Sequence, residues 1–131
     1  MALCLSHCHI DDSKFDVLAK GVVNSNLKYL NISWNQLTKK STRNLHDFIG
    51  NNEHLEKLML QHNEFGAEPM DMVCLALAAQ GNVRYIDISA NNIGEKGFKA
   101  FAKFIASPAS KNLEVFQCRR NEIGNVDNNV K

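Results

Sequence analysis

The chain has 131 residues, of which 44% are hydrophobic and 22% are charged, and its formal net charge is +1. This length and composition fit one globular domain with its own buried core, and they exclude a disordered or fibrous chain. Because the charges nearly cancel, nucleic acid or an anionic membrane is not expected as a partner. No apolar run reaches the ~18 residues of a membrane span, and the first residues lack the pattern of a secretory signal. We therefore expect a cytoplasmic protein without nucleic-acid or membrane partners.

The first expected element is a short strand within MALCLSHCHIDD, where Leu3 and Leu5 alternate as inward positions. The same segment holds residue types of zinc sites and catalytic triads: Cys4, Ser6, His7, Cys8, His9, Asp11 and Asp12. Structural zinc sites usually place two residues between paired cysteines, whereas three separate Cys4 from Cys8. No strained nucleophile turn accompanies the triad residue types, and the chain has no glycine-rich phosphate loop. We expect no metal, no other cofactor and no enzymatic activity.

Four later segments share one template: LKYLNISWNQL from Leu27, LEKLMLQHNEF from Leu55, VRYIDISANNI from Val83 and LEVFQCRRNEI from Leu113. In each, the first, fourth, sixth and eleventh positions are apolar and the ninth is Asn. These asparagines recur at intervals of 28, 28 and 30 residues, at Asn35, Asn63, Asn91 and Asn121. The stretch LCLSHCHI, 27 residues before Asn35, fits the same template with Cys8 at the Asn position. An internal repeat of this kind predicts a stack of similar units.

Between these segments, apolar residues recur at helical spacing. The inward faces of the expected helices carry, in chain order, Phe15, Leu18, Ala19 and Val22; Leu45, Phe48 and Ile49; Met72, Val73, Leu75, Ala76 and Ala79; and Phe98, Phe101, Ala102, Phe104 and Ile105. We also expect Cys74 and Cys118 to be small buried hydrophobic residues. Because neither the strand nor the helix of one unit can bury its apolar face alone, the units should stack on one another.

The repeated template resembles the leucine-rich repeat, and its period of about 28 residues with a full helix is similar to the ribonuclease-inhibitor type. The resemblance implies an α/β fold, a right-handed solenoid with about five parallel strands on the concave face and helices on the convex face. It also implies that the ninth position, which accepts Asn or Cys in this family, turns inward and satisfies backbone groups of the adjoining loop. The expected structural ladder is Cys8, Asn35, Asn63, Asn91 and Asn121.

The whole chain, residues 1–131, is expected to be a single leucine-rich repeat domain with repeats near 1–26, 27–54, 55–82, 83–112 and 113–131. The last repeat is incomplete because it stops at NEIGNVDNNVK without a helix. Terminal repeats normally need a polar cap, and neither end has a recognisable one. We therefore expect a fragment of a longer solenoid, or a chain that joins a partner or a second copy through its ends.

The strand positions that alternate with the core should face solvent and carry whatever function the fold has. They include the only Trp, both tyrosines and an Arg pair, which are residue types enriched at interface hot spots. The expected partner-binding residues are Tyr29, Trp34, Met59, His62, Tyr85, Asp87, Arg119 and Arg120. An alternative is structural: Trp34 could instead pack on His7 and His62, the tyrosines suit strands for packing reasons alone, and an Arg pair can solvate a rim.

The leading functional hypothesis is a noncatalytic protein-interaction module or scaffold segment that binds a protein partner through its concave strand face. One alternative is a regulator of the Ran GTPase-activating type, although the acidic tract typical of that group is absent and no catalytic arginine can be assigned from spacing. Another is a structural subunit of a ciliary or cytoskeletal assembly, held through its ends. The family includes all of these functions, because its members share a surface shape rather than one chemistry.

Overall fold

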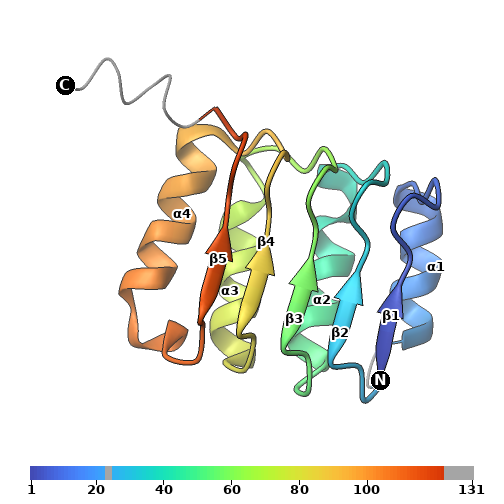
Figure 1. Ribbon diagram of the computed structural model, residues 1–131, viewed down its shortest axis with the longest axis horizontal. Helices are drawn as coiled ribbons and strands as arrows, with labels where there is room; N and C mark the ends of the chain where they lie inside the picture. Colours follow the sequence, from blue (N-terminus) through green and yellow to red (C-terminus); the bar gives the residue numbers. More distant parts are fainter. Residues whose placement is uncertain (23–24, 123–131) are drawn as a thin grey trace.

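The computed structural model describes residues 1–22 and 25–122, which form alternating strands and helices in a single right-handed solenoid (Figure 1). The strands are β1 (Ala2–Cys4), β2 (Tyr29–Asn31), β3 (Lys57–Met59), β4 (Tyr85–Asp87) and β5 (Val115–Gln117). The helices are α1 (Asp12–Val22), α2 (Thr42–Asn51), α3 (Met70–Gln80) and α4 (Gly94–Ala106), with 3₁₀ turns η1 (Lys39–Ser41) and η2 (Pro108–Ser110). The expected fold class is confirmed. No helix in the described ranges is long and apolar enough to cross a membrane.

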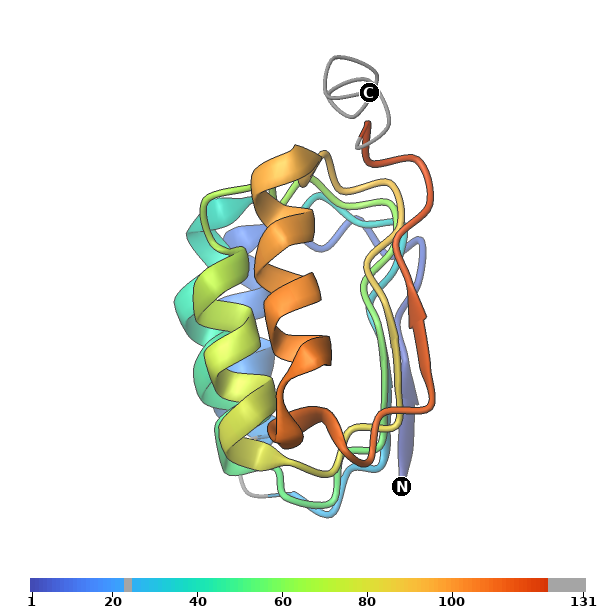
Figure 2. The same ribbon diagram turned by 90° about the vertical axis from the view of Figure 1, so that its left-hand side faces the viewer.

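The five strands form one parallel sheet in the order β1-β2-β3-β4-β5. Their register aligns the repeats, so that equivalent residues lie side by side: Ala2, Tyr29, Lys57, Tyr85 and Val115. The four helices lie together on one side of the sheet, and the two layers are seen edge-on in Figure 2. This leaves the opposite side of the sheet, here called the outer sheet face, without a covering layer in the described part of the chain.

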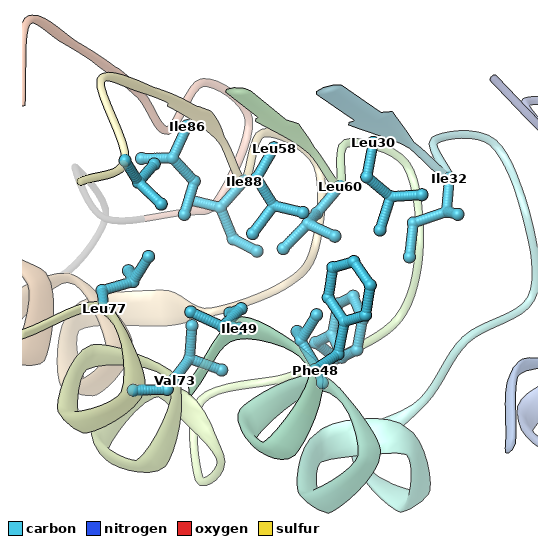
Figure 3. Packing of buried hydrophobic residues seen from close by; sticks show 14 of the residues in the cluster. Leu30, Ile32, Phe48, Ile49, Leu58, Leu60, Val73, Leu77, Ile86 and Ile88 are labelled. Carbon is cyan, nitrogen blue, oxygen red and sulfur yellow. The ribbon is translucent and has the colours of Figure 1, made fainter. Parts of the chain in front are cut away.

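The core lies between the two layers and consists of the inward residues of the repeats (Figure 3). Leu30, Leu58 and Ile86 form one row of strand residues, and they pack above Phe48 and Val73 of the helices. All five are fully or almost fully buried. Complete burial of a side chain of this size stabilises a fold by about 1.5–3 kcal/mol, so the rows of apolar residues account for the stacking.

The expected inward face is only partly correct on α3 and α4. The expected residues Met72, Leu75, Ala79, Ala102 and Ile105 are exposed. On α3 the buried residues are Met70, Val73, Cys74, Ala76 and Leu77. The reason is that the α3 sequence, MDMVCLALAAQ, is apolar on all sides, so its periodicity does not select one face.

The two cysteines expected in the core lie on its helix and strand sides. Cys74 is buried, and burial, followed by the nearby Asp71 charge, raises the pKa of its thiol to about 12. Cys118 is partly buried and packs against the core from β5's side. Burial and then the charge of Asp87 raise the pKa of the Cys118 thiol as well. Both thiols are therefore poor nucleophiles at neutral pH.

The asparagine at the ninth template position joins each repeat to its neighbour. The Asn91 side-chain amide donates to the carbonyl of Leu60 in the preceding repeat at 2.9 Å and to Ile88 and Ser89 in its own repeat at 3.2 and 3.1 Å. Asn35, Asn63 and Asn121 make corresponding bonds. Each side chain thus satisfies buried backbone groups on both sides of a repeat junction.

Cys8 lies at the edge of the solenoid and differs from the asparagines in its surroundings. Its thiol donates to the carbonyl of Ser6 at 3.4 Å, which matches the bond from Asn91 to Ser89. However, Cys8 is exposed, whereas Asn91 is fully buried. Cys8 therefore stays exposed in its expected position, because β1 is the edge strand of the described sheet and no described strand lies on its other side.

Asp12 makes a second junction, between α1 and η1. Its carboxylate accepts bonds from the Thr38 N–H at 2.9 Å, the Thr38 hydroxyl at 2.6 Å and the Ser41 hydroxyl at 2.5 Å. Burial by itself would raise the pKa of Asp12, but these hydrogen bonds together outweigh burial and lower the pKa below its ordinary value of 3.8. The charged carboxylate therefore fixes the first repeat to the second at neutral pH.

Candidate functional site

A lysine between two tyrosines forms the centre of the outer sheet face. The parallel register places Lys57 of β3 between Tyr29 of β2 and Tyr85 of β4. The Lys57 ammonium lies 5.4 Å from the Tyr29 ring centroid and 4.6 Å from that of Tyr85, within the range of cation–π attraction. The tyrosine hydroxyls are fixed as well, since each accepts a bond: from the Asn31 amide at 3.3 Å and from the Gln117 amide at 3.1 Å.

The expectation that every alternate strand position faces solvent is wrong for three residues: Ser33, Asp87 and Ser89 are buried. Asp87 is only 8% exposed, and its carboxylate accepts the Ser89 N–H at 2.9 Å. Asn31 accepts the Ser33 N–H in the same way at 3.0 Å. Asp and Asn often bond to the backbone two residues later, and here they stabilise the turn where the strand ends. Asp87 is thereby a poor contact for a partner.

In each repeat, the residue just before the ninth template position, which holds Asn or Cys, has a left-handed backbone. His7, Trp34, His62, Ala90 and Arg120 have φ between 55° and 59°. A non-glycine residue seldom adopts this conformation, yet the chain repeats it in five successive units. Equivalent side chains therefore leave the chain in the same direction, along one edge of the outer sheet face.

Three of these side chains form an aromatic stack, here called the rim stack: His7, Trp34 and His62. The Trp34 and His62 ring centroids are 3.6 Å apart with planes inclined by 13°, and those of His7 and Trp34 are 5.1 Å apart with planes inclined by 15°. Trp34 remains 47% exposed despite both contacts. A pocket of about 240 Å³ lies against the stack and is also lined by His9 and Gln36. Trp34 therefore packs against its neighbours and also presents an exposed aromatic surface.

The remaining expected site residues lie apart from the rim stack. Arg119 and Arg120 are exposed at the β5 end, and Ala90 occupies the rim position between His62 and Arg120. Met59 is partly buried on β3 between Asn31 and Asp87. The outer sheet face therefore carries aromatic residues along β1–β4 and an arginine pair after β5.

The cysteines and histidines near the N-terminus are not arranged as a metal site. Within residues 1–22 and 25–122, no group of three or more His, Cys, Asp or Glu side chains could hold a metal ion. Cys4 and Cys8 are both exposed, and the Cys4 sulfur lies 3.9 Å from the Ser6 hydroxyl. His7 faces Trp34, so its ring belongs to the rim stack.

Comparison with known families agrees with the architecture. A family model described as "Leucine Rich repeat" matches residues 23–41, 51–74 and 82–102. These three matches include β2, β3 and β4 and extend into α3 and α4. These three segments are leucine-rich repeats. Repeats of this family commonly mediate protein–protein interaction and are generally not enzymes.

Sequence reasoning missed two contributors to the outer sheet face. Lys57 is not among the expected binding residues, although it lies between both tyrosines. His7 was expected only as a packing neighbour, although it is exposed at one end of the rim stack. The alignment of the repeats gave the signal in both cases, because it already placed these residues beside Tyr29 and Trp34.

Proposed function

We propose that this leucine-rich repeat protein is a noncatalytic module or scaffold segment that binds a protein partner on its outer sheet face. The observation that carries the proposal is the rim stack, in which Trp34 is held between two imidazoles and still exposes about half of its surface. A held aromatic ring loses little conformational freedom on binding, which favours affinity. Trp and Tyr are also enriched among the residues that dominate binding energy.

We further propose that the repeats are of the ribonuclease-inhibitor-like type and that the protein acts in the cytoplasm. The subtype is supported by the 28-residue spacing of Asn35, Asn63 and Asn91 and by the full helix that follows each of β1 to β4. The partner-binding residues are Tyr29, Trp34, Met59, His62, Tyr85, Arg119 and Arg120, and Lys57 and His7 join this set. Asp87 contributes less to partner binding because it is buried.

The test is an affinity pulldown from native extract with three versions of the protein. The first is the wild-type chain, the second carries Trp34→Ala and Arg119→Glu, and the third is a control with Val17→Ala on the helix side, where Val17 is 72% exposed. Far-ultraviolet circular dichroism must show all three equally folded. We expect a partner that the wild type and the control retain and the double variant loses.

The identified partner is then titrated against the wild type while the fluorescence of Trp34, the only Trp in the chain, is recorded. Binding on the outer sheet face should change this emission directly. Loss of a ~2 kcal/mol contact in Trp34→Ala weakens affinity about 30-fold. If the double variant retains every partner of the wild type, the outer sheet face is not the binding surface.

A further inference from the structure

The outward side of α3 is an exposed apolar surface on the helix layer, far from the rim stack in the fold. Its residues Met72, Leu75 and Ala79 are exposed, and Leu75 is 67% exposed; we call them the α3 ridge. Asp71 is the only charged residue of α3. A helix that is apolar on all sides is normally buried on all sides. The described residues cover only the inward side of α3.

Two hollows flank the α3 ridge and share Leu75 and Asp71 as a common wall. One, of about 530 Å³, lies toward α2 and includes Met72 and Pro69; the other, of about 450 Å³, lies toward α4 and includes Ala78 and Ala100. The two alanines keep the second hollow open, since larger side chains would fill it. Grooves between packed helices accept the side-chain ridge of another helix, which is a recurrent mode of peptide recognition.

The borders of the hollows are basic. Lys40 and Arg43 line the first hollow and Lys103 lines the second, and none of the three forms an ion pair with the described residues. Lys39 is paired with Glu68 at 3.9 Å, which leaves Asp71 as the one other acid of the lining. An acidic occupant would complement these cations, whereas a second copy bound through the same surface would oppose them with the same charges.

We propose that the α3 ridge and its two hollows dock an amphipathic helix of another protein. Apolar residues of that helix contact Met72, Leu75 and Ala79, and acidic residues beside them face Lys40, Arg43 and Lys103. This surface lies on the helix layer, so its occupant would leave the outer sheet face free. The inference does not depend on the proposed function of the outer sheet face.

The probe is a pair of designed 18-residue amphipathic peptides labelled with fluorescein. Both have leucine at helical spacing on one face, and the remaining positions are mainly Glu in one peptide and mainly Lys in the other. Fluorescence anisotropy measures their binding to the full chain. We expect the Glu peptide to bind at least about tenfold more tightly than the Lys peptide, because only the Glu peptide matches the basic borders.

Four variants locate the binding. Leu75→Asp should lower the affinity for the Glu peptide at least tenfold. Lys103→Glu should lower the affinity for the Glu peptide severalfold and raise the affinity for the Lys peptide. Val17→Asp places the same charge on another exposed apolar residue of the helix layer and should change nothing. Trp34→Ala should also leave peptide binding unchanged, which separates this surface from the outer sheet face. Arg43→Glu replaces Leu75→Asp as the test if circular dichroism shows the latter unfolded.

Several results would overturn the proposal. They are equal affinity for the two peptides, no binding of either at 100-fold excess of protein over peptide, and an equal effect of Val17→Asp and Leu75→Asp. Sedimentation velocity adds another: a dimer that Leu75→Asp abolishes would show that a second copy occupies the α3 ridge instead of a foreign helix.

Discussion

Asn91 shows how one side chain can join two repeats. It is fully buried, its amide donates to three backbone carbonyls, and its oxygen accepts the Phe65 N–H at 3.4 Å. Each of the three carbonyls also accepts a bond from Asn63, Asn121 or the His62 N–H, whereas the buried Phe65 N–H bonds to Asn91 alone. The position was predictable because the spacing of the repeat identifies it.

Removal of this side chain should be costly. We expect Asn91→Ala to lower the free energy of unfolding by about 3 kcal/mol, because three buried carbonyls each lose one donor, the Phe65 N–H loses its acceptor and a small cavity remains. Urea denaturation followed by circular dichroism measures the change. The control is Asn51→Ala at the exposed end of α2, where Asn51 makes one bond to the Asp47 carbonyl at 2.8 Å and about 0.5 kcal/mol is expected. Similar losses for both variants would contradict a bridging role.

Other features at the residue scale were beyond the sequence. The periodicity of a strand states which side a residue faces, but it does not state whether the turn after the strand covers that residue, as happens to Ser33 and Ser89. In the same way, spacing placed His7, Trp34 and His62 in one row. Their stacking depends on the shared left-handed φ, and residue type did not indicate that conformation, because only glycine adopts it readily.

At the scale of elements, α3 and α4 differ in how well sequence predicted them. The existence and position of both helices followed from the repeat. The buried face of α3 did not, since apolar residues surround it, and Leu77 was not among the expected core residues although it is buried. For α4, the expected face is partly correct: Phe101 and Phe104 are buried and Phe98 is half-buried, while Ala102 and Ile105 are exposed.

Gly97 allows α4 to pack closely where it begins. A Cβ atom at Gly97 would lie 2.6 Å from the Ile93 Cβ and 3.1 Å from the Met70 Cγ. We expect Gly97→Ala to destabilise the fold by about 1–3 kcal/mol through overpacking, although alanine is the better helix former. Thermal unfolding measures the change in stability.

Gly50 is the matched control for this helical glycine. It lies in α2, and apart from its chain neighbours and the backbone of its own helix no atom lies within 4 Å of an added Cβ. Gly50→Ala should therefore stabilise the protein by about 0.5–1 kcal/mol, through helix propensity and reduced freedom of the unfolded chain. Effects of the same sign at the two positions would refute the packing argument.

At the scale of the whole molecule, burial increases from the first repeat toward the middle of the solenoid. Leu58 and Leu60 of the third repeat are completely buried, whereas Leu3 and Leu5 of the first are only partly buried. Each repeat contacts only its neighbours, so local stability is the sum of its own packing and that of its junctions. The expected fragment or end-joined chain stays a prediction, and residues 123–131 of the fifth expected repeat lie outside the described residues.

This gradient predicts unequal amide hydrogen exchange. The Leu5 N–H donates to the Asn31 carbonyl at 2.8 Å, and the equivalent Leu60 N–H donates to the Asp87 carbonyl at 2.9 Å. Although the bonds match, we expect the Leu60 amide to exchange at least about tenfold more slowly, because it opens only when both flanking repeats open. Nuclear magnetic resonance detects both rates. Equal protection would mean that the repeats unfold as one cooperative unit.

The uniform junctions described for the asparagines also make the repeats interchangeable. The strand register repeats from Tyr29 to Lys57 to Tyr85 in equal steps of 28 residues, and the asparagine of each repeat reaches back to the same carbonyl of the one before. Duplication or excision of one whole step therefore reproduces a junction that the chain already uses. Evolution can therefore add, remove or change one whole repeat at a time, and with it the exposed residues of the outer sheet face. The hydrogen bonds at the repeat junctions stay the same.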